Sequence, residues 1–345
     1  MYTREIRDDG RLTVATLTRP TLASFIDEVG GRVACLALSR DPNAKLTILL
    51  FPPGTEQPSY VAKVPTTEAA ARSVEREAAR LTELASRDLG AASLTVPRVI
   101  THLEHLGRPV LVTTALPGRS MLADYHAWRH TARRTSVAAD LAAAGAWLSG
   151  LHVQTASGAC RMEMMLDGIA GAISVRFGAR HGVDADLASV EGLRARLAGH
   201  SVPTTVVHGD FWPGNLLVSN GEVSGVIDWE MARLDGPATC DLARFAITYS
   251  LYLDRHTRPG RRVPGHPGLR AGRWGSGVDY IMNGTGWYPG LARAFVREGL
   301  ERLGVPGGCW RDVLLADLAV MAAQADHAEF AWNHLLAFRR LRKRS

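Results

Sequence analysis

Residues 206–218 read VVHGDFWPGNLLV, and this stretch decides how the rest of the chain is interpreted. An apolar run ends at His208, Asp210 follows on a short turn, and Asn215 opens a second apolar run. Thirteen residues after Asn215, the apolar segment GVID ends on Asp228. The sequence SNGE lies between the two runs and predicts a hairpin, which would bring Asp228 back close to Asn215.

The side chains of this stretch suit one kind of chemistry. Asp210 supplies a carboxylate that can accept a proton. The amide oxygen of Asn215 and the carboxylate of Asp228 are ligands that a hard cation such as Mg²⁺ prefers. A base, an amide oxygen and a metal-binding carboxylate are needed together in phosphoryl transfer.

These residues resemble a known family. HGD, an asparagine five residues after the aspartate, and IDWE are similar to the signature of aminoglycoside phosphotransferase-like and choline kinase-like enzymes, relatives of the protein kinases. The resemblance implies that Asp210 is the catalytic base and that Asn215 and Asp228 bind Mg²⁺. It also implies that ATP or GTP is the phosphate donor. His208, and Asp241 in GPATCDLARF, would support the catalytic loop.

The two halves of the chain differ in their sequence patterns. Three short runs of strand character between residues 32 and 64 predict an antiparallel meander, and the helical spacing over residues 66–90 predicts a helix. Two more extended segments follow. Long helical patterns then begin, such as residues 132–154, and a final helix is expected from about Arg311 to the tail.

The sequence therefore predicts an α+β chain with the two-lobed protein-kinase-like fold. A small antiparallel sheet with one helix would form a nucleotide-binding lobe over residues 1–116. A larger, mainly helical lobe over residues 117–345 would carry the catalytic and substrate-binding residues.

Two charged residues of the first half fit the resemblance. Lys63 lies on the third strand of the meander, where the family's lysine contacts the nucleotide phosphates. Its implied partner is Glu77 on the following helix, which matches the family's helix motif better than Glu75. Taken alone, either residue would be read as a solvated surface charge. The order of the elements favours the nucleotide-binding interpretation.

Further nucleotide contacts are expected from two loops. The segment TTALPG resembles the family hinge, which makes Thr113, Thr114, Ala115 and Leu116 candidates for the adenine edge; the alternative is a plain strand-to-turn transition. The first turn, SRDPNA, lacks the glycines of protein kinases. Backbone N–H groups of this turn, with Ser39 or Asn43, are expected to cover the phosphates instead.

The phosphate acceptor is expected to be a hydroxyl group of a small molecule, whether an antibiotic, an aminoglycoside, a nucleoside or a sugar-like metabolite. The basic stretch 255–277 either faces the acceptor, which would favour an anionic or neutral compound, or is merely solvated. Aromatic residues near it either stack on a flat acceptor or pack in the core. The candidate substrate-binding residues are Glu230, Asp235, Trp274, Trp287, Asp326 and Glu329.

Composition argues against other kinds of partner. The net charge is +6, but much of the excess lies in residues 255–277 and 339–345, without the interleaved aromatics of a nucleic-acid platform. No apolar run is long enough to span a membrane and no secretory signal is recognisable, so a cytoplasmic protein is expected. The four cysteines and twelve histidines show no zinc-ligand spacing.

Two other functions compete with a small-molecule kinase. A catalytically inactive, nucleotide-binding pseudokinase or regulatory module is disfavoured, because Lys63, Glu77, Asp210, Asn215 and Asp228 are all present. Protein kinase activity is disfavoured because no activation segment with an Ala-Pro-Glu ending is recognisable. The sequence leaves the oligomeric state open.

Overall fold

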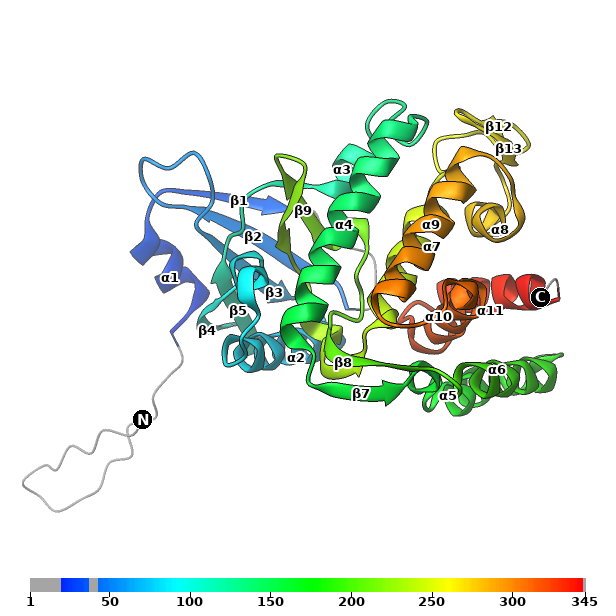
Figure 1. Cartoon of the computed structure of the whole chain (residues 1–345). Coiled ribbons are helices and arrows are strands. Elements are labelled where there is room, and N and C mark those ends of the chain that lie inside the picture. Colours follow the sequence, from blue (N-terminus) through cyan, green and yellow to red (C-terminus); the bar gives the residue numbers. More distant parts are fainter. Residues whose placement is uncertain (1–19, 37–42, 344–345) are drawn as a thin grey trace, which may run out of the picture.

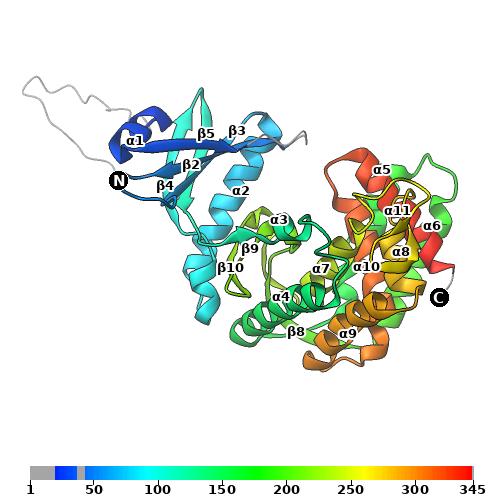
Figure 2. The ribbon, with the colours of Figure 1, turned by 90° about the horizontal axis from the view of Figure 1, so that it is seen from above.

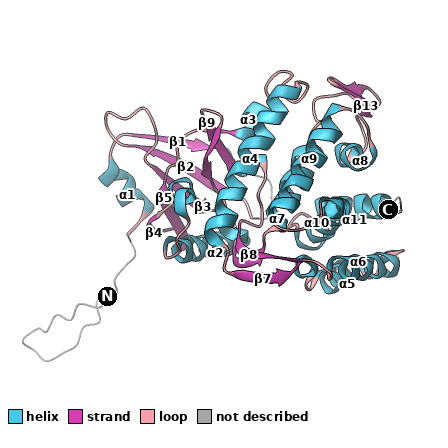
Figure 3. Cartoon of the chain, viewed as in Figure 1, coloured by secondary structure: helices cyan, strands magenta, loops and turns pink. Residues whose placement is uncertain are grey.

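The computed structural model describes residues 20–36 and 43–343, and these form two lobes. The strands of the first hundred residues gather at one end of the molecule, and most helices lie at the other end (Figures 1 and 2). Colouring by secondary structure shows the same division (Figure 3). The predicted α+β class, with a small antiparallel sheet and a helix in one lobe and mainly helices in the other, is thereby confirmed.

The small lobe is an antiparallel sheet in the order β1-β2-β3-β5-β4. Its strands are β1 (Arg32–Leu36), β2 (Lys45–Phe51), β3 (Tyr60–Pro65), β4 (Val99–His105) and β5 (Arg108–Thr114). The predicted meander of the first three strands is confirmed, with Lys63 paired to Thr47 on one side and to Leu111 on the other. An additional helix that the sequence did not predict, α1 (Leu22–Val29), precedes the sheet.

Helix α2 (Glu68–Ala85) follows β3 and begins where Thr67 caps it by accepting a hydrogen bond from the Ala70 N–H. Its buried face includes Val74, Ala78 and Leu81 at helical spacing. The helix ends before the predicted boundary at residue 90, and a 3₁₀ turn, η1 (Gly90–Thr95), leads from it toward β4.

The large lobe surrounds α7 (Thr239–Leu251), a helix whose residues are nearly all buried. Its other helices are α3 (Met121–Tyr125), α4 (Arg134–Thr155), α5 (Ile169–Phe177), α6 (Val183–Leu197), α8 (Ser276–Asn283), α9 (Trp287–Arg302), α10 (Trp310–Gln324) and α11 (Ala328–Arg342). Short 3₁₀ turns are η2 (Met162–Leu166), η3 (Pro213–Asn215), η4 (Trp229–Met231) and η5 (Gly307–Cys309). Among the described residues, no helix is both long and apolar enough to cross a membrane.

Three small sheets complete the large lobe. They have the orders β10-β9-β6, β11-β8-β7 and β12-β13. Their strands are β6 (Arg119–Ser120), β7 (Gly158–Arg161), β8 (Ser201–Val207), β9 (Leu216–Ser219), β10 (Glu222–Val226), β11 (Arg233–Pro237), β12 (Arg262–Val263) and β13 (His266–Arg270). The predicted hairpin is confirmed: β9 and β10 are antiparallel, and Asn220 and Gly221 both have positive φ at the turn.

The expected final helix proves to be two helices. The apolar positions continue from α10 into α11, but residues 325–327 leave the helical conformation. The ring of His327 accepts a hydrogen bond from the Phe330 N–H and so starts α11. The basic stretch 255–277 also contains the β12-β13 hairpin.

Candidate functional site

The HGD loop is fixed to the centre of the large lobe by one carboxylate. Asp241, on α7, accepts hydrogen bonds from the N–H groups of His208 (2.6 Å) and Gly209 (2.9 Å) through its two oxygens. Asp241 is fully buried, and this burial raises the pKa of its carboxyl group, although His208 and the two backbone donors act in the opposite direction. The two backbone N–H groups that precede Asp210 are therefore hydrogen-bonded to a side chain of the buried helix α7.

Gly209 is needed for the shape of this loop. Its φ is +82°, and a Cβ at this position would lie 2.4 Å from the carbonyl oxygen of Met231. Both the dihedral angle and the close approach exclude a side chain.

Asp210 and Asn215 face each other across the next turn. The Asn215 side-chain amide donates to the Asp210 carbonyl oxygen (2.9 Å) and to its carboxylate (3.1 Å). The Asn215 carbonyl oxygen accepts from the Ile227 N–H (2.9 Å), and the His208 ring bonds to the Ile227 carbonyl oxygen (2.8 Å). Asp228, the next residue, is thus held beside the HGD loop, as the hairpin signal predicted.

Asp228 adopts a left-handed backbone conformation, with φ 64° and ψ 62°. Its carboxylate forms an ion pair with Lys63 of β3, which joins the two lobes. Burial acts to raise the pKa of Asp228, but Lys63 and Lys45 outweigh it and lower the pKa to about 2. The group is therefore a carboxylate at neutral pH.

Lys63 is also bound by the helix of the small lobe. Its ammonium group lies 2.5 Å and 2.7 Å from the two oxygens of Glu77, and both side chains are buried. Burial alone would lower the pKa of Lys63, but Asp228 and Glu77 together raise it, so the amine stays charged. Burial raises the pKa of Glu77, and Lys63 opposes this.

A second ion pair connects the lobes next to the first. Lys45, at the start of β2, lies 2.7 Å from Glu230 and donates to the Ser73 hydroxyl at 3.0 Å. Carboxylate oxygens of Glu77, Asp228 and Glu230 all lie within 4.8 Å of one another. Such a set of hard oxygen ligands fits a divalent cation.

Arg244 is a residue of this site that the sequence interpretation missed. It lies on α7, one turn after Asp241, and is buried. Its guanidinium donates to the Gly209 carbonyl oxygen (3.1 Å) and to the Asp210 carboxylate (3.3 Å), and it forms an ion pair with Asp317 of α10 (3.1 Å). The signal was present in DLARF, the segment that contains Asp241, but nothing in the pattern shows that this arginine turns inward.

In the segment expected to bind the adenine edge, some backbone groups already form hydrogen bonds within the protein. The N–H groups of Thr114 and Ala115 donate to the carbonyl oxygens of Arg98 and Ser59, each at 2.9 Å. Thr113 is buried at the end of β5, and Leu116 packs against Gly225. Adenine recognition by these four residues stays a prediction.

The turn that was expected to cover the phosphates is described in part. Ser39 lies outside the described residues. Asn43 donates from its side-chain amide to Asp326, between α10 and α11, at 3.0 Å. The turn therefore contacts a residue predicted for the acceptor, and the two lobes meet here as well.

The other predicted acceptor residues have separate partners. Asp235 accepts from Ser157 at 3.1 Å, and Trp274 packs against Phe330 and His334. Trp287 stacks on His266, and Glu329 lies in the first turn of α11. In the part of the chain that is described, no hydrogen bond or ring contact joins any two of the six candidates, whose roles stay predictions.

Trp212 is an aromatic side chain closer to the catalytic loop, and the sequence interpretation passed over it. It lies two residues after Asp210, and its ring is 6.1 Å from that of Tyr252. A Cβ on Gly214 would lie 2.3 Å from the Trp212 ring, so a larger residue at position 214 would displace the indole.

Comparison with known proteins confirms the predicted two-lobed protein-kinase-like fold. The model of a family described as "Phosphotransferase enzyme family" matches residues 53–273. The streptomycin-ATP ternary complex of APH(2")-IIa is similar at 16% identity and a TM-score of 0.51, covering 92% of this chain and 95% of that one. The aminoglycoside phosphotransferase APH(4)-Ia matches at 16% identity and a TM-score of 0.55, covering 92% and 97%. No curated protein matches.

Proposed function

Because the chain belongs to the Phosphotransferase enzyme family, we propose that it transfers the γ-phosphate of ATP or GTP to a hydroxyl group of a small molecule in the presence of Mg²⁺. The observation that carries the proposal is one connected network. It links Lys63 and Glu77 of the small lobe to Asp228, which lies beside the Asp210 and Asn215 pair of the large lobe.

In this proposal Asp210 orients the acceptor hydroxyl and takes its proton as the oxygen attacks phosphorus. Asn215 and Arg244 hold its carboxylate in place from two sides, so little reorganisation is needed when the acceptor binds. Lys63 stabilises the negative charge that develops on the phosphates. A Mg²⁺ ion held by Asn215 and Asp228 would neutralise further phosphate charge.

The acceptor class rests on the family and on the chemistry of the site. Streptomycin and hygromycin B are the compounds named for similar structures, at 15 to 17% identity. For this chain we propose a hydroxylated small molecule of the antibiotic, aminoglycoside, nucleoside or sugar type. Trp212 offers an indole face close to Asp210 on which such a molecule could pack.

The test is a transfer reaction with the purified protein. The protein is incubated with Mg²⁺, ATP or GTP and a library of hydroxylated compounds, and phosphorylated products are sought by mass spectrometry. We expect one compound class to gain a phosphate. Nucleotide binding without any product would instead favour the pseudokinase alternative, and phosphate found only on protein substrates would favour a protein kinase.

Asp210→Asn provides the mechanistic control. The amide keeps the shape of the side chain but cannot accept the proton, so turnover should fall by roughly 10² to 10⁴-fold. Nucleotide affinity, measured by calorimetry, should stay unchanged, because Asp210 forms no hydrogen bond or ion pair with Lys63 or Glu77. Near-normal turnover in this variant would contradict the role of Asp210.

A further inference from the structure

A pocket that contains none of the residues of the proposed phosphotransfer site lies between α4 and α9, which run side by side in Figure 1. It has a volume of about 140 Å³. A groove of about 410 Å³ continues from it along the same two helices, and Ser149 and Arg302 line both. The inner pocket is bounded mainly by apolar side chains, including Leu148, Leu242, Leu303 and Pro203.

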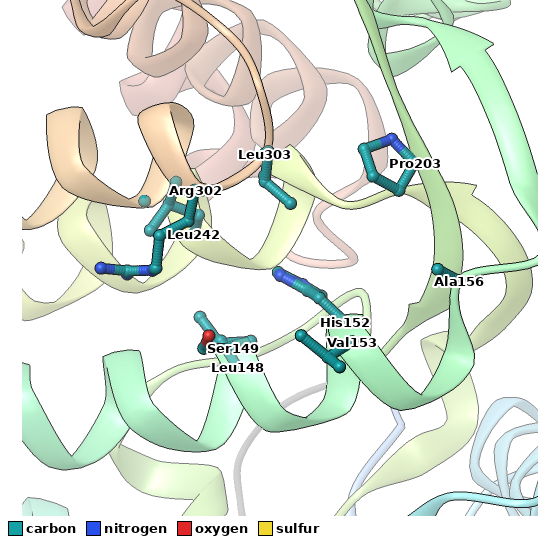
Figure 4. A pocket seen from close by; sticks show the side chains of 10 residues that line it. Leu148, Ser149, His152, Val153, Ala156, Pro203, Leu242, Arg302 and Leu303 are labelled. Atoms are coloured by element: carbon teal, nitrogen blue, oxygen red, sulfur yellow. The ribbon is translucent and has the colours of Figure 1, made fainter.

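One buried polar atom in this pocket lacks a partner. His152 of α4 is only 8% exposed, and its Nε2 atom has no hydrogen-bond partner among the residues that the structure describes. Figure 4 shows the ring projecting from α4 into the space below Leu303 and Leu242. A buried polar group without a partner costs free energy, which a ligand with a matching polar group would recover. Burial, reinforced by Arg302, lowers the pKa of His152 to about 4, so the ring is neutral at pH 7.

Arg302 supplies a charge at the junction of pocket and groove. It lies in the last turn of α9, and its guanidinium points away from His152 in Figure 4. It is exposed and forms no ion pair with any residue in the described ranges 20–36 and 43–343. Glu298 also lines the groove but not the inner pocket, so a ligand carboxylate is favoured at the junction beside Arg302 and not farther along the groove.

These features define the size and polarity of a ligand. An apolar cavity of roughly 150 Å³ holds a molecule the size of benzene. The apolar walls suit an aromatic ring, the Nε2 atom of His152 suits a hydroxyl group at its inner end, and Arg302 suits a carboxylate at its outer end.

We infer that the pocket between α4 and α9 is a binding site for a small hydroxylated aromatic carboxylic acid, separate from the phosphotransfer site. The ring lies between Leu148, Leu242 and Leu303, the hydroxyl group bonds to His152, and the carboxylate pairs with Arg302. Leu242 follows Asp241 on α7, so the ligand packs on the helix that holds the catalytic loop. Binding at this pocket does not depend on the proposed reaction.

Calorimetry on the full chain without nucleotide tests the site with three probes: 4-hydroxybenzoate, benzoate and phenol. We expect 4-hydroxybenzoate to bind about tenfold or more tightly than phenol, because phenol cannot form the charge-assisted bond to Arg302. Benzoate, which lacks the hydroxyl group, should also bind more weakly. Arg302→Gln should reduce the affinity for 4-hydroxybenzoate to that of phenol, and leave phenol unaffected.

Ser149→Leu fills the junction between pocket and groove and should abolish binding of all three probes. Ser174→Leu, at an exposed position of α5, is the matched control and should bind like the unmodified protein. Failure of all three probes to bind overturns the inference. Binding that survives both Ser149→Leu and Arg302→Gln unchanged overturns it too, as does equal affinity for phenol and 4-hydroxybenzoate. If Ser149→Leu does not fold, the Arg302→Gln comparison decides.

Discussion

Arg244 is the side chain through which the core of the large lobe reaches the proposed base. Its guanidinium lies between the Asp210 and Asp317 carboxylates, and within the described residues it donates to oxygens of the HGD loop and of α10. Burial would lower the pKa of Arg244, but Asp317 and Asp210 outweigh it and raise the pKa, so the arginine is charged. The buried ion pair between Arg244 and Asp317 stabilises the fold. The contact of Arg244 with Asp210 also holds the Asp210 carboxylate in position.

The two roles are separable by substitution. Arg244→Met leaves Asp317 buried without its cation, and we expect unfolding in urea to show a loss of about 3 to 5 kcal/mol. The double variant Arg244→Met with Asp317→Leu removes both charges and should recover most of that stability. Turnover should stay low in the double variant, because nothing replaces the bond to Asp210.

Equal recovery of turnover and stability in the double variant would show that Arg244 only stabilises the fold.

Asp210, Asn215 and Asp228 could be predicted from the sequence because they lie on one short stretch, and its hairpin brings them close together. The Arg244 and Asp317 pair could not be found in this way. The two residues are separated by 73 positions, and only the packing of α10 on α7 brings them together. Such contacts depend on how helices cross, which residue spacing does not encode.

At the level of elements, the contact of α7 with α9 depends on one glycine. A Cβ on Gly299 would lie 2.5 Å from a methyl group of Leu242. Gly290, on the same helix, has no atom within 4 Å of the same position. Neither glycine has a positive φ, so the two positions differ chiefly in how much room there is for a Cβ atom.

The pair gives a matched test of this helix crossing. Gly299→Ala should lower the free energy of unfolding by about 1 to 3 kcal/mol, because α9 must move or Leu242 must leave its rotamer. Gly290→Ala should raise it by about 0.5 to 1 kcal/mol, because alanine favours a helix. Urea unfolding of both variants measures the difference, and equal effects would mean that α9 is not closely packed at Gly299.

The sequence predicted the elements that have a clear local residue pattern. It did not predict the helix ends that depend on individual side-chain contacts. The strand meander and the Asn220-Gly221 turn follow from alternation and turn residues. The break at residues 325–327 is hidden because buried positions keep the helical spacing on both sides of it, such as Leu318 and Ala322 in α10 and Ala331 and Leu335 in α11. The fold class was available from the sequence, whereas helix ends depended on individual caps.

Across the whole molecule, three buried histidines make stability sensitive to acid. Burial lowers the pKa of His152 and His266 to about 4 and that of His334 to about 3, against an ordinary value of 6.5. Between pH 6.5 and the lowered values, the unfolded chain binds protons that the folded chain does not. Stability must therefore fall as the pH falls through this window.

The expected slope is up to about 1.4 kcal/mol per pH unit for each histidine. Urea unfolding between about pH 7 and pH 5 measures it. His334→Gln should give a shallower slope, because one of the three groups no longer titrates. A stability that stays constant over this range, or an unchanged slope in the variant, would contradict the prediction.

The left-handed backbone at Asp228 limits how this carboxylate can be studied by substitution. Asparagine and aspartate tolerate that conformation, whereas alanine and glutamate strain it by about 1 to 2 kcal/mol. Asp228→Asn is therefore the variant that removes charge and little else. Alanine at this position would remove the proposed Mg²⁺ ligand and also strain the backbone, so a loss of activity in that variant could not be assigned to either effect alone.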